Sequence, residues 1–154
     1  MLMATTWIVA ADAGRARILQ VADRDRRLEE LEDLLNPEGR LKDGELAADA
    51  RGRWSGPDRP GGNAMHEEVS PSEHVAEVFA KRIGDYLEKA RTEHRYEQLY
   101  LVAPPKFLGV LRRKLDRDVE KLVMRELPKD LSGLRIQDLQ EQLAELVQGN
   151  VRAP

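Results

Sequence analysis

Two short segments near the N-terminus carry the periodicities of β-strands. Residues 7–11 form a compact apolar run, and residues 15–21 alternate between polar and apolar positions. Asp12, Ala13 and Gly14 lie between them. An aspartate that accepts from its own backbone, followed by a glycine free to adopt positive φ, favours a tight turn. We therefore predict an antiparallel hairpin.

Leucines dominate the following segment, residues 28–35. Their spacing also suits a helix, but a third antiparallel strand fits the preceding hairpin better. From residue 36 the pattern dissolves into glycines and prolines among charged residues, which predicts a long, flexible Gly/Pro-rich loop at about 36–70. Loops of this length inside compact domains are uncommon and are either functional or disordered, so candidate chemistry is sought there first.

The second half of the chain reads as alternating helices and strands. Ser70, Pro71 and Glu73 predict a capped helix start, because they supply an N-cap, a first-turn proline and the acid of a capping box. An apolar run at 99–103 predicts a buried strand that ends at two prolines. A second helix is predicted from apolar positions at Phe107, Leu108, Leu111, Leu115 and Val119. Residues 122–127 continue that spacing but also fit a short strand, which we favour. A last amphipathic helix is predicted from Ile136 to Val147, with Gly149 as its terminator.

This order of elements predicts an α/β fold: three antiparallel strands, then helix, strand, helix, strand and helix. We interpret it as a ribonuclease H-like mixed sheet covered by helices. The 154 residues suit a single domain, since one core of this size buries about two-thirds of the unfolded surface.

Composition narrows the function classes. With 25 basic and 28 acidic residues the net charge is −3, so any attraction to nucleic acid must be local. The chain has no cysteine, which excludes disulfides and thiolate chemistry and agrees with a reducing compartment. The first eleven residues resemble neither a signal peptide nor an anchor, so we expect a cytoplasmic protein without membrane contact.

Most catalytic motifs fail on inspection. Asp12 suits one ligand of a two-metal nuclease, but the strand at 99–103 ends without an acid, and the hairpin turn already explains Asp12. His66 and Glu67 open like a zinc-protease motif whose second histidine is replaced by Ser70. His74 lies near two acids without an accepted ligand spacing. No phosphate-binding glycine loop or serine-hydrolase elbow occurs, so we expect neither a bound metal nor a cofactor.

Two groups of cations are candidates for RNA contact. The second predicted helix carries four of them, at Lys106, Arg112, Arg113 and Lys114. The long loop adds Arg51, Arg53 and Trp54, which combine positive charge with a surface on which bases stack. A charged helix face is more often merely solvated, and this alternative stays open.

Four segments resemble the bacterial family known as host-attachment proteins. They are WIVAADAGRAR at 7–17, LEDLLNP at 31–37, LVAPPKFLG at 101–109 and KDL at 129–131. The resemblance implies kinship with the middle domain of archaeal and eukaryotic peptide-release factors, which hydrolyse peptidyl-tRNA with a Gly-Gly-Gln loop placed before the first helix.

Gly61, Gly62 and Asn63 occupy the corresponding place in this chain, which makes them the candidate catalytic loop under that resemblance. Asparagine is shorter than glutamine by one methylene, about 1.5 Å. A displacement of ~1 Å can cost ~100-fold in rate, so this loop argues against hydrolysis. The alternative is that these residues are ordinary turn chemistry.

The combined interpretation is a ribosome- or tRNA-associated factor that binds RNA rather than hydrolysing it. If the chain is an enzyme, the resemblance implies an ester hydrolase acting on peptidyl-tRNA. The alternative is a non-enzymatic protein-interaction module that acts indirectly in host-cell attachment, and homo-oligomerisation stays open. A metal-dependent nuclease is the third reading.

Overall fold

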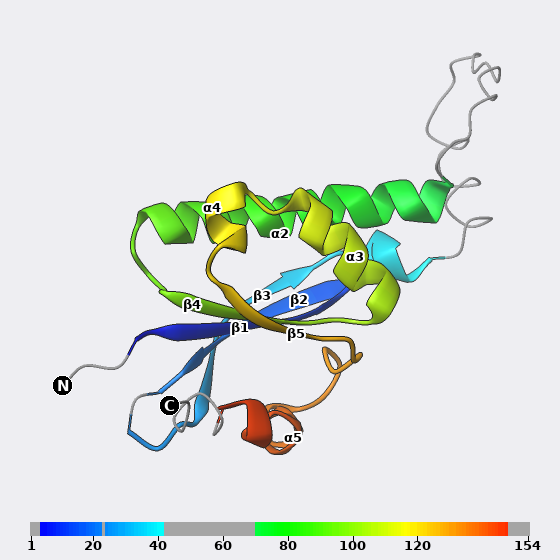
Figure 1. Cartoon of the computed structure of the whole chain (residues 1–154). Coiled ribbons are helices and arrows are strands. Elements are labelled where there is room, and N and C mark those ends of the chain that lie inside the picture. The colour runs from blue at the N-terminus through cyan, green and yellow to red at the C-terminus, as the bar shows by residue number, and fades with distance from the viewer. Residues whose placement is uncertain (1–3, 23, 42–69, 148–154) are drawn as a thin grey trace, which may run out of the picture.

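A five-stranded mixed sheet forms the centre of the fold (Figure 1). The structure is a computed structural model that describes residues 4–22, 24–41 and 70–147. Its strands are β1 (Thr6–Asp12), β2 (Arg15–Val21), β3 (Leu28–Leu35), β4 (Gln98–Val102) and β5 (Val123–Leu127). They lie in the order β3-β2-β1-β4-β5, with β2 antiparallel to both neighbours and β4 parallel to both of its own. The predicted mixed sheet is therefore confirmed, including the two segments whose spacing also suited a helix.

Helices cover both faces of this sheet (Figure 1). One face carries α2 (Pro71–Thr92), α3 (Pro105–Lys114) and the short α4 (Arg117–Glu120), while α5 (Ile136–Gln142) lies on the other. A 3₁₀ turn, η1 (Pro37–Arg40), follows β3, so the long loop predicted at about 36–70 begins with ordered structure. No helix within the described ranges is long and apolar enough to cross a membrane. The cytoplasmic location and the single-domain organisation stay predictions.

The start of α2 matches the sequence pattern in detail. The Ser70 hydroxyl accepts a hydrogen bond from the Glu73 backbone N–H at 3.2 Å, and the Glu73 carboxylate accepts one from the Ser70 N–H at 3.2 Å. Pro71 takes the first helical position, where its missing N–H costs nothing. The predicted capping box is confirmed.

The second predicted helix is wrong in one respect, because it is two helices. Leu115 has extended backbone, and the Asp116 carboxylate accepts from the Asp118 N–H at 3.0 Å to start α4. A short acidic side chain that captures a nearby N–H competes with helix continuation. The end of α3 also lies tightly against α2, since a Cβ on Gly84 would lie 2.6 Å from the Lys114 carbonyl oxygen.

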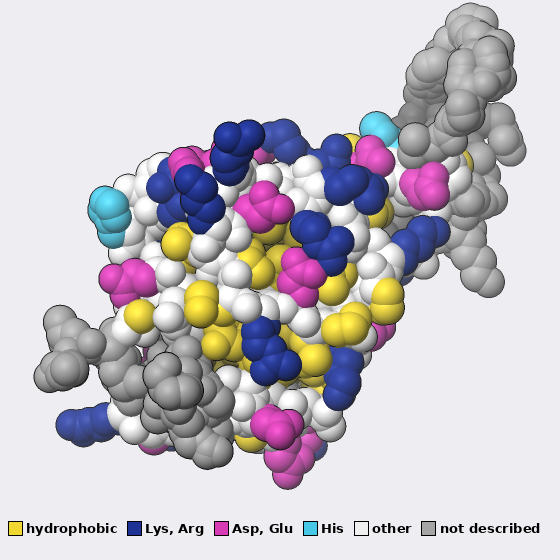
Figure 2. Space-filling view, viewed as in Figure 1, with side chains coloured by type: hydrophobic (Ala, Val, Ile, Leu, Met, Phe, Trp, Pro, Cys, Tyr) yellow, Lys and Arg dark blue, Asp and Glu magenta, His cyan; other side chains and the backbone are white. Residues whose placement is uncertain are grey.

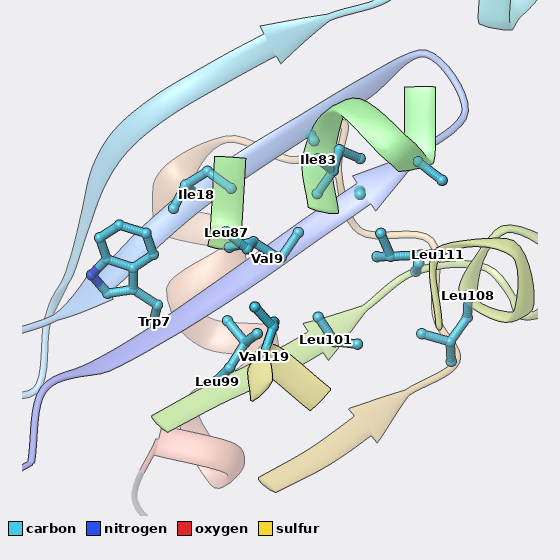
Figure 3. Packing of buried hydrophobic residues seen from close by; sticks show 14 of the residues in the cluster. Trp7, Val9, Ile18, Ile83, Leu87, Leu99, Leu101, Leu108, Leu111 and Val119 are labelled. Carbon is cyan, nitrogen blue, oxygen red and sulfur yellow. The ribbon is translucent and has the colours of Figure 1, made fainter. Parts of the chain in front are cut away.

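Two hydrophobic cores lie on opposite faces of the sheet. The larger one packs alternate β1 residues, Trp7 and Val9, against α2, α3 and α4 (Figure 3). The smaller one packs Ile8 and Ala10 against α5 and the segment before it. Because β1 is buried on both faces, its sequence is a continuous apolar run rather than an alternating one.

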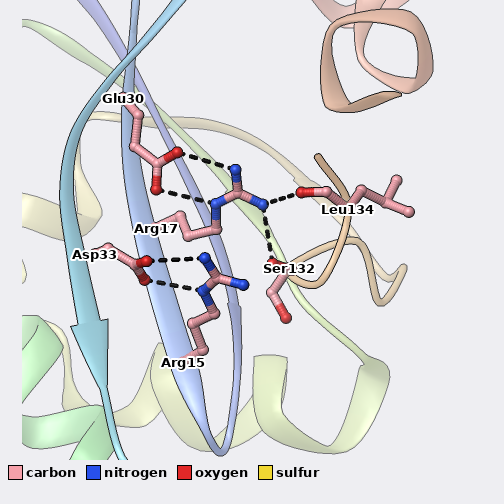
Figure 4. Close-up of polar contacts among 6 residues, drawn as sticks. All are labelled: Arg15, Arg17, Glu30, Asp33, Ser132 and Leu134. Atoms are coloured by element: carbon pink, nitrogen blue, oxygen red, sulfur yellow. Dashed lines mark hydrogen bonds and ion pairs between the residues drawn. The ribbon is translucent and has the colours of Figure 1, made fainter. Parts of the chain in front are cut away.

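Arg17 is a charged residue buried beside the smaller core, with 3% of its surface exposed. Its guanidinium forms an ion pair with Glu30 at 2.9 Å and donates to the backbone carbonyls of Ser132, at 3.0 Å, and Leu134 (Figure 4). These bonds satisfy a charge that would otherwise be costly to bury. Arg17, on β2, therefore links the segment between β5 and α5 to β2 and β3.

Candidate functional site

A cavity of about 450 Å³ opens where β1 and β4 end. The strand order reverses at this point, because β2 and β3 lie on one side of β1 while β4 and β5 lie on the other side. In open α/β sheets ligands bind in the crevice beyond the carboxyl ends of strands at such a switch point. We call this cavity the β1–β4 pocket; its lining residues are Asp12, Ala13, Gly14, Gly39, Arg40, Ser72, Glu73, Ala76, Pro104, Lys106, Phe107 and Val110.

One wall of the pocket is formed by the β1–β2 turn, which is hydrogen-bonded to the residue that follows β3. The Asp12 carboxylate accepts from the Gly14 N–H at 2.8 Å, as the turn chemistry predicted. Asn36 holds the turn from outside, donating its backbone N–H to the Gly14 carbonyl and its side-chain amide to the Ala13 carbonyl, both at 2.9 Å. Gly39 lies so close that any Cβ there would collide with the Ala13 carbonyl oxygen. This wall is therefore rigidly defined.

The conformation predicted for Gly14 is wrong, because Gly14 does not adopt positive φ. Its missing side chain serves a different purpose. A Cβ at Gly14 would lie 2.8 Å from the Arg40 side chain, which packs across the turn. Arg40 thereby reaches the Asp12 carboxylate, with 3.7 Å between Nη1 and Oδ2.

Four charged side chains line the pocket, and three of them already have partners. Asp12 has Arg40 and the Gly14 N–H, and Glu73 serves the capping box of α2. Lys106, in the first turn of α3, forms no ion pair with any residue in the described ranges. The described lining is neutral by formal count, and Lys106 is its one charged side chain without a hydrogen-bond or ion-pair partner in the described ranges.

The described residues of the pocket do not form the arrangement that a two-metal nuclease needs. Such an enzyme clamps its metals between several converging carboxylates. Within the described ranges no three histidine, aspartate or glutamate side chains gather in this way, and that includes the neighbourhoods of Asp12 and His74. The nearest charged partner of Asp12 is a cation, Arg40.

The four predicted RNA-binding residues of α3 fall into two pairs. Arg112 is held by Glu126, with its Nη2 2.5 Å and its Nε 3.1 Å from the carboxylate oxygens, and the bond holds the pKa of the Glu126 carboxyl below its usual range. Lys114 lies 3.9 Å from the Glu77 carboxylate.

Lys106 and Arg113 form the second pair. Both are exposed, and in the part of the chain that the structure describes neither forms an ion pair. The structure therefore separates two engaged cations from two available ones on a single helix.

The remaining predicted site residues lie outside the described ranges. They are the candidate catalytic loop, Gly61, Gly62 and Asn63, and the cations and aromatic residue of the long loop, Arg51, Arg53 and Trp54. Of the described residues on either side of this segment, Leu41 follows the lining residue Arg40 directly and Ser70 lies two positions before the lining residue Ser72. The chain thus enters and leaves the segment beside the pocket.

Comparison with known proteins gives the family. Residues 7–143 match the family model described as "Protein required for attachment to host cells". The chain belongs to this family. A curated relative of this host-attachment protein is "Uncharacterized protein RP470" from Rickettsia prowazekii (strain Madrid E), 34% identical over 68 residues. The match covers 43% of this chain and 44% of that relative, so it spans less than half of the relative's length.

Among the similar solved structures is a chain named "Archaeal protein". It is 12% identical, with a TM-score of 0.42, and the match covers 96% of this chain and 40% of that chain.

Three of the four segments that carried the family resemblance meet at the β1–β4 pocket. The β1–β2 turn, Asn36 with the start of η1, and the Pro104–Phe107 segment all border it or support its wall. The fourth, 129–131, lies elsewhere. Sequence reasoning treated these segments separately and missed Arg40 and Ala76 as pocket residues. One signal was available in the sequence. Several of the resemblance segments include the ends of predicted strands, and parallel strands bring their carboxyl ends to the same edge of the sheet.

Proposed function

We propose that this host-attachment protein binds RNA through the unpaired cations of α3, beside the β1–β4 pocket, as a ribosome- or tRNA-associated factor. The observation that carries the proposal is the state of Lys106 and Arg113. Both are exposed, α3 contains no acidic residue, and neither cation is neutralised within the described ranges. Exposed cations without partners bind phosphates without first breaking an ion pair.

The two cations are placed to follow a phosphate backbone. They are seven residues apart, which is close to two helical turns, so they lie on one side of α3 about 10.5 Å apart along its axis. On the face seen in Figure 2, Lys and Arg side chains lie over the layer of α2, α3 and α4 with acidic side chains interspersed among them. Several cations of this layer are ion-paired, such as Lys81 with Asp85, so the proposal rests on Lys106 and Arg113.

Binding without hydrolysis is the better-supported form of the proposal. Asp12 and Glu73, the two carboxylates of the described pocket lining, are both engaged, Asp12 by Arg40 and a backbone N–H and Glu73 by the Ser70 N–H, which leaves them poorly placed to activate water. The hydrolytic alternative depends on Gly61, Gly62 and Asn63 alone. The strand order β3-β2-β1-β4-β5 supports the further proposal of a ribonuclease H-like fold related to the release-factor middle domain.

The experiment is co-sedimentation with ribosomes and binding to tRNA, at low and high salt, using two double variants of equal charge. Lys106→Gln with Arg113→Gln removes the unpaired cations. Arg112→Gln with Lys114→Gln removes the paired ones from the same helix. We expect salt-sensitive binding by the native chain, a large loss in the first variant and a small one in the second. Equal losses, or no RNA binding by the native chain, would overturn the proposal.

A second candidate function, protein interaction, is favoured by the edge strand β3. Leu31 is 36% exposed and Leu35 is 58% exposed, and both lie on β3, which pairs with β2 on one side and is the edge strand of the described sheet. Edge strands with exposed apolar side chains offer a template for an added strand. If RNA binding is absent, pull-down of partners by the native chain and by Leu35→Lys tests this surface, and equal capture by both would exclude it.

A further inference from the structure

The β1–β4 pocket has two chemically different sides. Ala76, Phe107 and Val110 from α2 and α3 form an apolar side. Lys106, Glu73 and the Asp12–Arg40 pair supply the pocket's charged groups. Pockets that bind small molecules combine an apolar lining with a few placed polar groups in this way. The ligand that complements this pocket is apolar at one end and polar at the other.

The size of the pocket limits the ligand to a small molecule or one unit of a polymer. Its volume of about 450 Å³ falls within the roughly 300–1,000 Å³ typical of small-molecule sites. A helix or a folded partner does not fit a cavity of this volume. One nucleotide, with its flat base and its charged phosphate, matches both the volume and the division into two sides.

Two cations of the pocket, Lys106 and Arg40, favour an anionic group at the polar end of the ligand. Neither Lys106 nor Glu73 has an ion-pair partner in the described ranges, but the Glu73 carboxylate accepts a hydrogen bond from the Ser70 N–H, whereas Lys106 has no such partner. Arg40 adds a second donor, because it is 56% exposed and its 3.7 Å separation from Asp12 is longer than a direct charge-assisted hydrogen bond. A phosphate near Lys106 is therefore within the field of two cations, while Asp12 keeps its bond from Gly14.

We propose that the β1–β4 pocket binds a nucleoside monophosphate unit, with the base against Ala76 and Val110 and the phosphate at Lys106. This inference rests on the proposed RNA-binding function, because Lys106 belongs to both the pocket and the α3 surface. RNA lying along α3 toward its first turn ends at the pocket mouth, so a terminal nucleotide is one source of the ligand. A free nucleotide offers the same chemistry and is the other source.

The test is an NMR titration of the ¹⁵N-labelled full chain with adenosine 5′-monophosphate. Gly14 and Gly39 report from the pocket wall, and Gly84 and Gly133 report from elsewhere. We expect saturable shifts at the first two amides only. Adenosine and ribose 5-phosphate each lack half of the ligand and should bind about tenfold more weakly or worse. No saturable shift at Gly14 or Gly39 with any nucleotide would overturn the inference.

Variants separate the pocket from the RNA surface. Lys106→Gln should weaken the nucleotide about tenfold or more, and Ala76→Leu should block it by filling the apolar side. Arg113→Gln is the matched control, since it removes a cation from the same helix outside the pocket lining. Unchanged signals of Gly84 and Gly133 verify that each variant is folded. If Arg113→Gln weakens the nucleotide as much as Lys106→Gln does, the pocket is not the site.

Short RNA strands identify the source of the ligand and keep the two proposals separate. A strand with a 5′-terminal phosphate that shifts Gly14 and displaces adenosine 5′-monophosphate supports the RNA end, while displacement by no strand supports the free nucleotide. RNA binding that depends on Arg113 without any pocket shift would refute the pocket and leave the RNA surface standing. Nucleotide binding by a chain that binds no RNA would refute the RNA surface instead.

Discussion

The two ends of the parallel pair β1 and β4 are built in opposite ways. At the amino end, Trp7 stacks on Tyr96 with ring centroids 4.8 Å apart, Arg95 lies over the Trp7 ring, and the indole N–H donates to Gln20. At the carboxyl end lie a glycine-rich wall, a loose ion pair and an open cavity. The first end supplies stability through packing, while the second leaves space and charge available for a ligand.

The largest expected effect tests the packed end. Replacing Trp7, which is 1% exposed, with alanine removes the largest fully buried side chain of the core and leaves a cavity. We expect a loss of ~3–5 kcal/mol in the free energy of unfolding, measured by urea denaturation. Trp7→Phe keeps much of the ring contact and should cost clearly less. Equal losses in both variants would show that the ring packing contributes little.

A smaller loss is expected from Gly39→Ala at the open end. The new methyl group meets the Ala13 carbonyl oxygen, so η1 must move away from the β1–β2 turn. We expect a cost of ~1–3 kcal/mol, the usual range for overpacking, together with altered amide signals at Gly14. Gly133→Ala is the matched control, because a Cβ there meets nothing within 4 Å. A native-like Gly39→Ala would contradict the close contact.

The paired cation of α3 should contribute modestly and in a pH-dependent way. The bond from Arg112 holds the pKa of Glu126 below its ordinary value of 4.5. A depressed carboxyl pKa contributes stability above the ordinary pKa and loses it as pH falls through the lowered one. The free energy of unfolding of the native chain should therefore exceed that of Glu126→Gln by about 1 kcal/mol or less at about pH 6, and the difference should shrink as the pH falls below the ordinary carboxyl pKa. A difference that grows on acidification would contradict the pairing.

The smallest expected effect on stability is at Lys106. Because it has no ion-pair partner in the described ranges, Lys106→Gln should change the free energy of unfolding by less than about 0.5 kcal/mol. The same denaturation measurement checks it beside Trp7→Ala. A clear destabilisation would mean that this cation supports the fold, which would weaken the case for a ligand.

Features that depend on neighbouring residues were predictable from sequence. The capping box of α2 spans four positions, and the strands follow from periodicities of a few residues, so local pattern was sufficient. The strand at Leu28–Leu35 required the hairpin before it as context. The mixed sheet followed from the order of these strands and helices along the chain.

Features created by distant contacts were not predictable. The close approach of α3 to α2 at Gly84 and the burial of Arg17 against carbonyls more than a hundred residues away both depend on tertiary contacts. The pocket joins four separate segments, so its residues had no common signal. The four cations of α3 looked alike in sequence, and only Glu126 and Glu77 distinguish them.

The salt dependence of tRNA binding tests the central claim most directly. Fluorescence anisotropy of labelled tRNA gives log K against log salt for the native chain and the two charge-matched double variants. The slope is negative, and each lost phosphate contact reduces its magnitude by roughly 0.7–0.9. We predict a slope reduced by about two contacts for Lys106→Gln with Arg113→Gln, and little change for Arg112→Gln with Lys114→Gln. Identical slopes for all three proteins would contradict the assignment of RNA binding to the unpaired cations of α3.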